Sequence, residues 1–152
     1  MPKPYPKLNF PPIKLRAQRQ KDSDTLMVWS SVRSCYLVLT PEEWVRRHLV
    51  EYLLNEHSTP PAQIIEEYPV LLNGQNQRAD IVVVDGNRPL LLAECKAPDI
   101  NLSQETLSQA VRYNSVVNAR YIVLTNGVKH LCFERTPQGE YLPLRSFPDL
   151  WR

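Results

Sequence analysis

The residues best suited to chemistry are two carboxylates and a lysine near the middle of the chain. Asp80 heads the apolar run 81–84, and Glu94 and Lys96 close a second apolar run that ends at Cys95. Carboxylate oxygens are the ligands that Mg²⁺ prefers, and a nearby ammonium group can orient a water molecule or stabilise charge on a phosphate. These three side chains therefore predict a metal-dependent phosphodiesterase site.

Segment 85–89, Asp-Gly-Asn-Arg-Pro, lies between the two runs and is typical of a hairpin turn. A hairpin centred on Asn87 pairs Val84 with Leu90, Val82 with Leu92, and Asp80 with Glu94. Directly opposed side chains have Cβ atoms about 4.5–5.5 Å apart. Two carboxylates at that separation repel by roughly 3 kcal/mol at an effective dielectric near 20. A divalent cation between them, or a raised pKa on one of them, would remove this repulsion.

Alternation along the second strand puts Glu94 and Lys96 on one face and Cys95 on the other. The simpler alternative is that Glu94 and Lys96 are ordinary charges at a strand end and that Asp80 is bonded to a nearby turn. Residues 89–93 are apolar on both faces, so this strand is expected to be buried. Charges at the tip of a buried strand favour a functional site.

Turn and cap signals predict the elements that must hold these residues. Thr40 and Glu43 form a capping box with Pro41 at the first helical position, which predicts a helix to about His57. Ser103 caps a second helix to about Asn118. We expect strands at 64–72, 77–84, the run that ends at Lys96, 121–125 and 128–134. This gives a mixed α/β fold of order α-β-β-β-α-β-β.

Several polar residues on these elements have both a functional and a structural interpretation. Gln109, Arg112 and Tyr113 share a helix face and could position a nucleic-acid backbone, or they could form a polar outer face with a half-packed tyrosine. His48 is expected to be a packed histidine within an apolar stripe. Glu66 and Glu67 could enlarge the acidic cluster, but we expect both to be exposed to solvent, and we assign no role to His130.

Composition is typical of one small domain. The chain has 152 residues and a net charge of +2, and it contains no apolar run of membrane-spanning length and no signal-peptide pattern. We therefore expect a cytoplasmic protein with no membrane partner. Three widely spaced cysteines, without a C-x-x-C pair, argue against a disulfide framework and a zinc cluster.

The N-terminal segment differs in composition from the rest of the chain. Its first 21 residues carry six basic residues and no acidic one, and five prolines lie within the first twelve. Lys14, Arg16 and Arg19 could follow a phosphate backbone, or the segment could be a solvated arm that wraps the domain. We expect extended segments at 13–20 and 25–39, outside the core. The predicted organisation is an arm at 1–39 and a nuclease-like domain at 40–152.

Together these residues resemble the PD-(D/E)XK nuclease signature, with Ala79 where the signature name has proline. The wider sequence looks like the N-terminal domain of type I restriction enzyme R subunits, and is similar to the small stand-alone bacterial proteins that carry only this domain. The resemblance covers about residues 40–135 and is carried by segments 40–46, 78–83, 94–98 and 112–114.

The resemblance implies a restriction-endonuclease-like core and an Mg²⁺ site, with Mn²⁺ as a substitute. The implied ligands are Asp80, Glu94 and the backbone carbonyl of Cys95, with Lys96 orienting the attacking water. A glutamine and a tyrosine beside the active site of such enzymes match Gln109, as a catalytic residue, and Tyr113. An acidic residue on the first helix matches Glu43, which its cap position explains equally well.

The implied substrate is DNA, with RNA less favoured, and the implied activity is that of an Mg²⁺-dependent endonuclease. The rival interpretations are a nucleic-acid-binding or regulatory module with little turnover and a purely structural interaction domain. The chain has no G-x-x-x-x-G-K-[ST] sequence, so any motor, like any specificity subunit, would be a separate partner. One site cuts one strand, so duplex cleavage would need a homodimer or two separate events.

Overall fold

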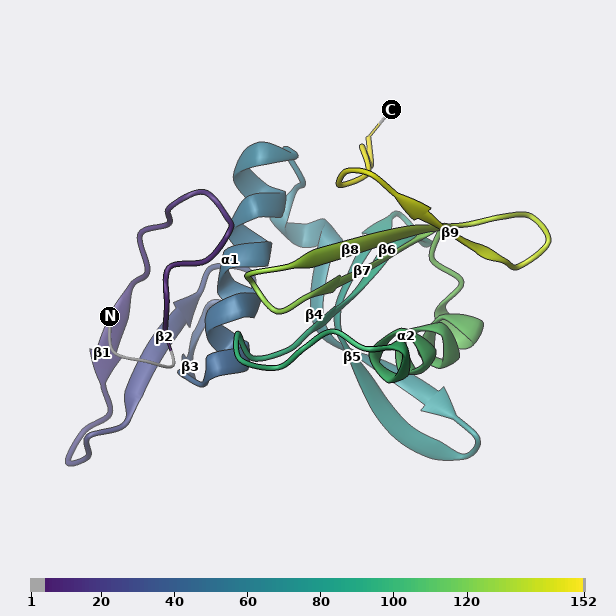
Figure 1. Cartoon of the computed structure of the whole chain (residues 1–152). Helices are drawn as coiled ribbons and strands as arrows, with labels where there is room; N and C mark the ends of the chain where they lie inside the picture. The colour runs from purple at the N-terminus through teal and green to yellow at the C-terminus, as the bar shows by residue number, and fades with distance from the viewer. Residues whose placement is uncertain (1–4, 152) are drawn as a thin grey trace.

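The computed structural model describes residues 5–151, in which nine strands and two α-helices form a mixed α/β fold (Figure 1). The helices are α1 (Pro41–Glu56) and α2 (Gln104–Val117), with a short 3-10 helix at Pro61–Gln63. The strands are β1 (Ala17–Arg19), β2 (Leu26–Ser30), β3 (Cys35–Val38), β4 (Ile64–Leu72), β5 (Gln75–Asp85), β6 (Arg88–Cys95), β7 (Tyr121–Thr125), β8 (His130–Arg135) and β9 (Tyr141–Leu144).

Strands β4 to β9 form one six-stranded sheet in sequence order. Only β6 and β7 are parallel, and α2 makes the crossover between them. The predicted order from α1 to β8 is confirmed, and β9 is an additional edge strand. The strand expected at 128–134 begins two residues later than predicted, because Thr125 pairs with His130 and the loop between β7 and β8 has four residues.

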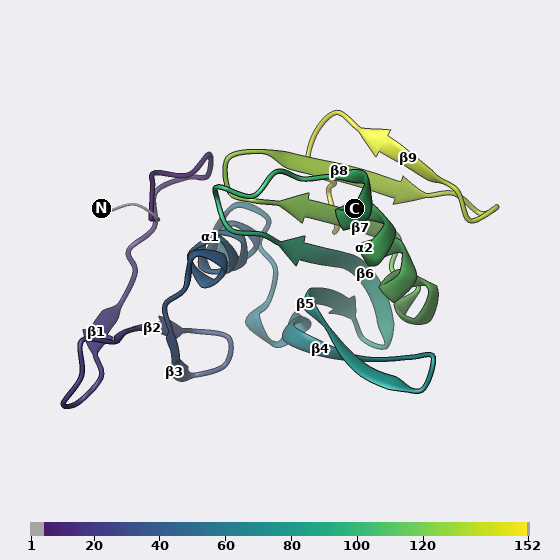
Figure 2. The same ribbon diagram turned by 60° about the horizontal axis from the view of Figure 1, so that its bottom comes forward.

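The helices lie on opposite faces of this sheet (Figure 2). Side chains of α1 pack with Ile81, Leu91 and Val123 in one buried cluster. Side chains of α2 pack with the alternate residues of the same strands, among them Leu92 and Ile122, in the other. Leu90 to Cys95 are all buried, so the central strand β6 is covered on both faces as predicted.

The β5–β6 hairpin has a tighter turn than predicted. Asp85 pairs with Arg88, and Val84 lies opposite Pro89 rather than Leu90. The register then shifts by one residue between Val83 and Val84, which leaves Leu90 as the extra residue of a bulge. Beyond the bulge, Val82 pairs with Leu92 as predicted. The same register, continued by two residues, sets Asp80 opposite Glu94.

Helix α1 begins as the sequence predicts. The Thr40 side chain accepts a hydrogen bond from the Glu43 backbone N–H at 3.1 Å. His48 is buried, and its Nδ1 lies 2.7 Å from the Trp44 carbonyl oxygen, which confirms it as a packed histidine. In the described part of the chain, no helix is long and apolar enough to cross a membrane. Cys35, Cys95 and Cys132 are free thiols.

The N-terminal strands form a separate three-stranded sheet beside α1 (Figure 1). Leu8, Val28 and Leu39 belong to the buried cluster under α1, so the expectation that this segment lies outside the core is wrong. His130 also has a structural role that the sequence did not indicate: its Nε2 lies 2.8 Å from the Asn9 carbonyl oxygen. The first four residues of the predicted arm, Lys3 among them, lie outside the described residues.

Gly127 is expected to be the glycine least tolerant of substitution. It has φ +85°, and an added Cβ would lie 2.6 Å from a Leu8 methyl carbon. Gly139 has the same φ and no atom within 4 Å of such a Cβ. Gly127→Ala should therefore lower the free energy of unfolding by about 1–3 kcal/mol more than Gly139→Ala, as measured by urea denaturation. Equal losses would show that Leu8 does not pack there.

Candidate functional site

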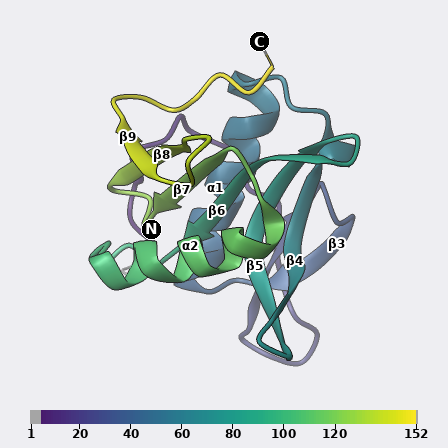
Figure 3. The same cartoon turned by 90° about the vertical axis from the view of Figure 1, so that its right-hand side faces the viewer.

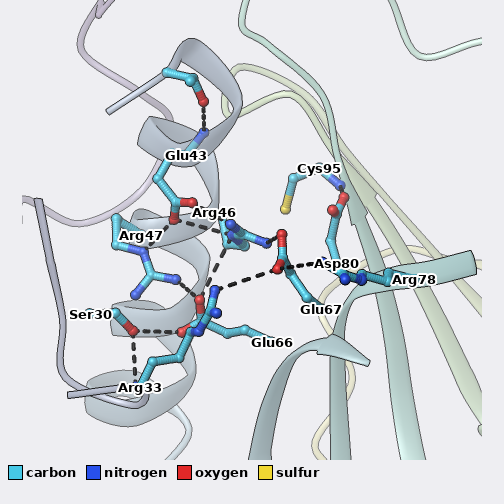
Figure 4. Close-up of polar contacts among 11 residues, drawn as sticks. Ser30, Arg33, Glu43, Arg46, Arg47, Glu66, Glu67, Arg78, Asp80 and Cys95 are labelled. Carbon is cyan, nitrogen blue, oxygen red and sulfur yellow. Dashed lines mark hydrogen bonds and ion pairs between the residues drawn. The ribbon is translucent and has the colours of Figure 1, made fainter. Parts of the chain in front are cut away.

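The candidate site lies where β5 and β6 separate. Their pairing ends at Ile81–Ala93, while β5 continues outward with β4 alone. At this point a side chain replaces the backbone ladder: Asp80 Oδ2 accepts a hydrogen bond from the Cys95 N–H at 2.7 Å (Figure 4). Asp80 is half-buried. The aspartate is thus fixed to the tip of the central strand.

Glu94 is buried next to Asp80, with 6% of its surface exposed. Its Oε1 has no hydrogen-bond partner within the described residues. Burial, together with the neighbouring charge of Asp80, raises the pKa of the Glu94 carboxyl from its ordinary value of 4.5 to about 9, and Lys96 opposes the shift. The predicted juxtaposition of Asp80 and Glu94 is present.

Lys96 lies directly beyond β6, and its backbone N–H donates to the Thr125 carbonyl oxygen at 2.8 Å. Its half-buried side chain lines a cavity of about 400 Å³ that reaches α2 at Gln109. Gln109 Nε2 donates to the Tyr113 hydroxyl at 3.0 Å, and Tyr113 is only 6% exposed. Arg112 is exposed on the same helix. The structure thus brings Lys96 and Gln109 to one cavity.

A second cavity, of about 200 Å³, adjoins Asp80 on the side of α1. Glu43 lines it, but the Glu43 carboxylate accepts hydrogen bonds from Arg46 Nε at 3.1 Å and Arg47 Nε at 2.7 Å. Burial favours a higher pKa for Glu43, yet the two arginines outweigh it and hold the pKa below 4.5. The carboxylate of Glu43 is therefore engaged by arginine, and its role as a metal ligand stays a prediction.

Comparison with known protein families identifies a match. The family model for the N terminus of type I restriction enzyme R proteins matches residues 41–148. The chain belongs to this family. The match runs from the start of α1 past the end of β9, so it includes every element around Asp80, Glu94 and Lys96. A comparison with curated proteins found no match.

In this member of the R-protein N-terminal family, a buried ion-pair network joins α1 to β4 (Figure 4). Arg47 Nη2 donates to Glu66 Oε1, and the Ser30 hydroxyl donates to Glu66 Oε2 at 3.0 Å. Glu66 is only 8% exposed, so the expectation that it faces solvent is wrong. Glu67 is partly exposed, with the Arg46 guanidinium 3.6 Å away.

Sequence reasoning missed this network because its members come from three separate elements. The local signals are the i, i+3 and i, i+4 spacings of Glu43 with Arg46 and Arg47, which favour ion pairs on one helix face. Nothing in the sequence indicates that Ser30, 36 residues before Glu66, would reach it. The network rigidly attaches the helix that forms one wall of the Asp80 cavity.

The basic residues of the N-terminal segment lie apart from the polar face of α2. Lys14, Arg16 and Arg19 are all exposed. The Arg16 guanidinium stacks 4.9 Å from the Trp29 ring centroid, and Arg19 lies 3.6 Å from Asp24. Figures 1 and 2 show the three-stranded sheet on one side of α1 and α2 on the other. The structure therefore does not join these residues to Arg112 and Tyr113.

The residues present fit a hard divalent cation only in part. Across residues 5–151, no three His, Cys, Asp or Glu side chains are gathered closely enough to hold a metal ion. Two adjacent carboxylates, however, are oxygen ligands of the type that Mg²⁺ accepts with water and backbone oxygen completing its shell. The unpartnered, buried Glu94 Oε1 is the atom that a cation would satisfy.

Replacing Glu66 should destabilise the fold strongly. Glu66→Gln leaves the buried Arg47 without an anionic partner on β4, and breaking a buried ion pair costs about 3–5 kcal/mol. Glu67→Gln is the matched control, because the neighbouring side chain is about a third exposed and should change stability by about 1 kcal/mol or less. Urea denaturation measures both values. Similar losses of stability in the two variants would show that the buried Arg47–Glu66 pair contributes no more than the partly exposed Glu67.

Glu94 should make stability depend on pH. A carboxyl whose folded pKa is raised holds a proton that the unfolded chain releases, so stability falls as pH rises from 4.5 towards 9. Between pH 5 and pH 8, wild-type protein should lose at least about 1.4 kcal/mol relative to Glu94→Gln, the equivalent of one pKa unit. Glu105→Gln, at an exposed site, should follow the wild type. Parallel curves for wild type and Glu94→Gln would exclude a raised pKa.

Proposed function

We propose that the chain is a nuclease domain of the PD-(D/E)XK type that hydrolyses DNA phosphodiester bonds with Mg²⁺ or Mn²⁺. The single observation that carries the proposal is the pair of adjacent carboxylates, Asp80 and Glu94, at the tip of a buried strand, with Glu94 Oε1 unpartnered. A fold would not retain two opposed acids in a buried position without a function for them. The sheet with a helix on each face is then a restriction-endonuclease-like core.

The proposed cation ligands are Asp80, Glu94 and the backbone carbonyl of Cys95. A divalent ion bound there would supply Lewis acidity to a phosphoryl oxygen. Asp80 is already oriented by the Cys95 N–H, so little side-chain freedom would be lost on binding. Glu94 would have to release its proton to become a ligand, which makes cation affinity rise with pH. Glu43 could join this set only by leaving Arg46 and Arg47.

Lys96 and α2 would act on the substrate directly. The Lys96 ammonium would orient the attacking water and stabilise negative charge on the phosphoryl oxygens. Gln109 lines the same cavity, and its hydrogen bond to Tyr113 fixes its amide. Arg112, exposed one helical turn further on, would contact a backbone phosphate. These roles together position a strand across the end of β6.

The substrate assignment follows from the family. The matched family model is named after type I restriction enzyme R proteins, and this name supports DNA rather than RNA as the substrate. It also supports separate motor and specificity subunits as partners. A homodimer remains the alternative arrangement for cutting both strands.

One observation favours a second candidate function, a DNA-binding module with little turnover on the same fold. Glu43, the first-helix acidic residue that the family resemblance places at the metal, is held by two arginines. Of the three carboxylates proposed as cation ligands, only Asp80 and Glu94 are then left to hold a cation. Such a module would bind DNA without cutting it.

Cleavage of supercoiled, linear and single-stranded DNA with Mg²⁺ or Mn²⁺ tests the proposal. Asp80→Ala removes a proposed cation ligand and Lys96→Ala removes the charge that stabilises the transition state, so each should lower the cleavage rate by at least about 100-fold. Nicked circles would indicate single events, and linear products would indicate paired sites.

Two exposed residues give matched controls. Asp85→Ala and Lys129→Ala remove the same side-chain types at exposed positions that line neither the Asp80 cavity nor the Lys96 cavity, and should leave the rate within about twofold of wild type. DNA binding without cleavage by wild-type protein would establish the second candidate. A folded protein that neither binds nor cuts DNA would exclude both candidates.

A further inference from the structure

The outer half of the β4–β5 hairpin is a two-stranded ribbon. Residues 75–79 pair with β4, whereas β5 pairs with β6 only from Ile81 to Asp85. Figure 3 shows this hairpin extending beyond the rest of the sheet, with α2 crossing near its base. Ala79 and Val70, the partner of Gln77, are buried in the cluster that includes α2, so the ribbon is anchored against this helix as far out as Gln77. It is a fixed projection next to the candidate site.

One face of the ribbon extends a row of polar side chains that begins on α2 with Gln109 and Tyr113. Gln109 donates to the Tyr113 hydroxyl, which in turn donates to Gln77 Oε1 at 3.5 Å. Gln77 Nε2 then donates to Gln75 Oε1 at 3.4 Å. Asn76, between these two glutamines in the strand, lies on the opposite face. The row therefore runs without interruption from the Lys96 cavity to the ribbon.

A cleft of about 310 Å³ lies along this row. It is lined mainly by amides, a tyrosine and an arginine: Leu72, Asn73, Gln75, Gln77, Gln109, Arg112 and Tyr113. Gln109 also lines the cavity that contains Lys96, so the two depressions share a wall. A chain that passes Lys96 and crosses α2 would reach the ribbon next.

We propose that this face of the β4–β5 ribbon, formed by Gln75 and Gln77, enters the major groove of duplex DNA and contacts adenine edges. The inference rests on the proposed function and adds the element that grips the substrate. Residues 68–79 contain one arginine and no acidic residue, so no carboxylate opposes the DNA backbone. A two-stranded ribbon fits a groove about 12 Å wide, and a glutamine amide can pair with both N6 and N7 of adenine. Gln77 would exchange its long bonds to Tyr113 and Gln75 for those to the base.

The same geometry excludes duplex RNA as an equal ligand. The major groove of an A-form helix is too deep and narrow for side chains to read its bases. Arg112, exposed at the edge of the cleft, is placed to contact phosphate while the glutamines face the bases. The proposed ligand is therefore a B-form duplex that contains adenine–thymine pairs.

The test is equilibrium binding of the full chain to labelled duplexes of the same length, rich in A·T or in G·C pairs, and to duplex RNA. All proteins carry Asp80→Ala so that no cleavage occurs during the measurement. Adding Gln75→Ala with Gln77→Ala should raise the dissociation constant for the A·T duplex at least tenfold. Adding Asn76→Ala, on the opposite face of the same strand, should change it by no more than about twofold.

The outcomes separate this inference from the proposed function. If wild-type protein cuts DNA but the glutamine variant binds the A·T duplex as its parent does, the ribbon assignment is overturned and the nuclease assignment stands. Equal losses of affinity for the A·T duplex in the glutamine and Asn76 variants would also overturn the ribbon assignment. So would a loss of affinity for duplex RNA, in the glutamine variant, as large as its loss for the A·T duplex. If wild-type protein neither cuts nor binds DNA, both assignments fail. Thermal unfolding midpoints within about 2 °C of the parent establish that each variant is folded.

Discussion

The hydrogen bond from the Cys95 N–H to Asp80 is the interaction on which the rest of the site depends. Where β5 turns away from β6, the N–H at the strand tip loses its ladder partner, and a buried donor without an acceptor is costly. Asp80 supplies the acceptor. In doing so it is held opposite Glu94, and the repulsion between the two carboxyls is relieved by the raised pKa of Glu94. Asp80 thus meets a backbone requirement and also forms half of the acidic pair, whereas Glu94 Oε1 has no such structural partner within the described residues.

The negative charge around Asp80 and Glu94 is offset by arginine side chains rather than by solvent. Arg46 and Asp80 line the same cavity, and Arg46 is held there by Glu43. Behind it, the Arg47–Glu66 pair attaches α1 to β4. A helix attached this way cannot shift without breaking a buried ion pair, so the wall of the cavity is rigid. Preorganised charge of this kind is what a site for phosphate chemistry requires.

Local signals explain what the sequence could predict. Thr40 and Ser103 mark both helix starts, and the apolar run before Glu94 indicates a buried strand, because caps and burial act within a few residues. Contacts between distant segments were beyond such reasoning. The bulge at Leu90, the edge strand β9 and the burial of Glu66 by Ser30 and Arg47 each depend on packing between elements. No local propensity specifies these contacts.

Because β5 separates from β6 beyond Ile81, the two ends of β5 have different roles. From Ile81 to Asp85, β5 pairs with β6, and this pairing places Asp80 beside the tip of β6. Away from the turn at Asp85, β5 leaves the sheet with β4 as its partner and becomes the ribbon beside α2. Only two residues, Arg78 and Ala79, lie between Gln77 and Asp80, so β5 itself sets the distance between the acidic pair and the ribbon. A substrate held by the ribbon would therefore be presented to the carboxylates in a fixed register, with no hinge between binding and chemistry.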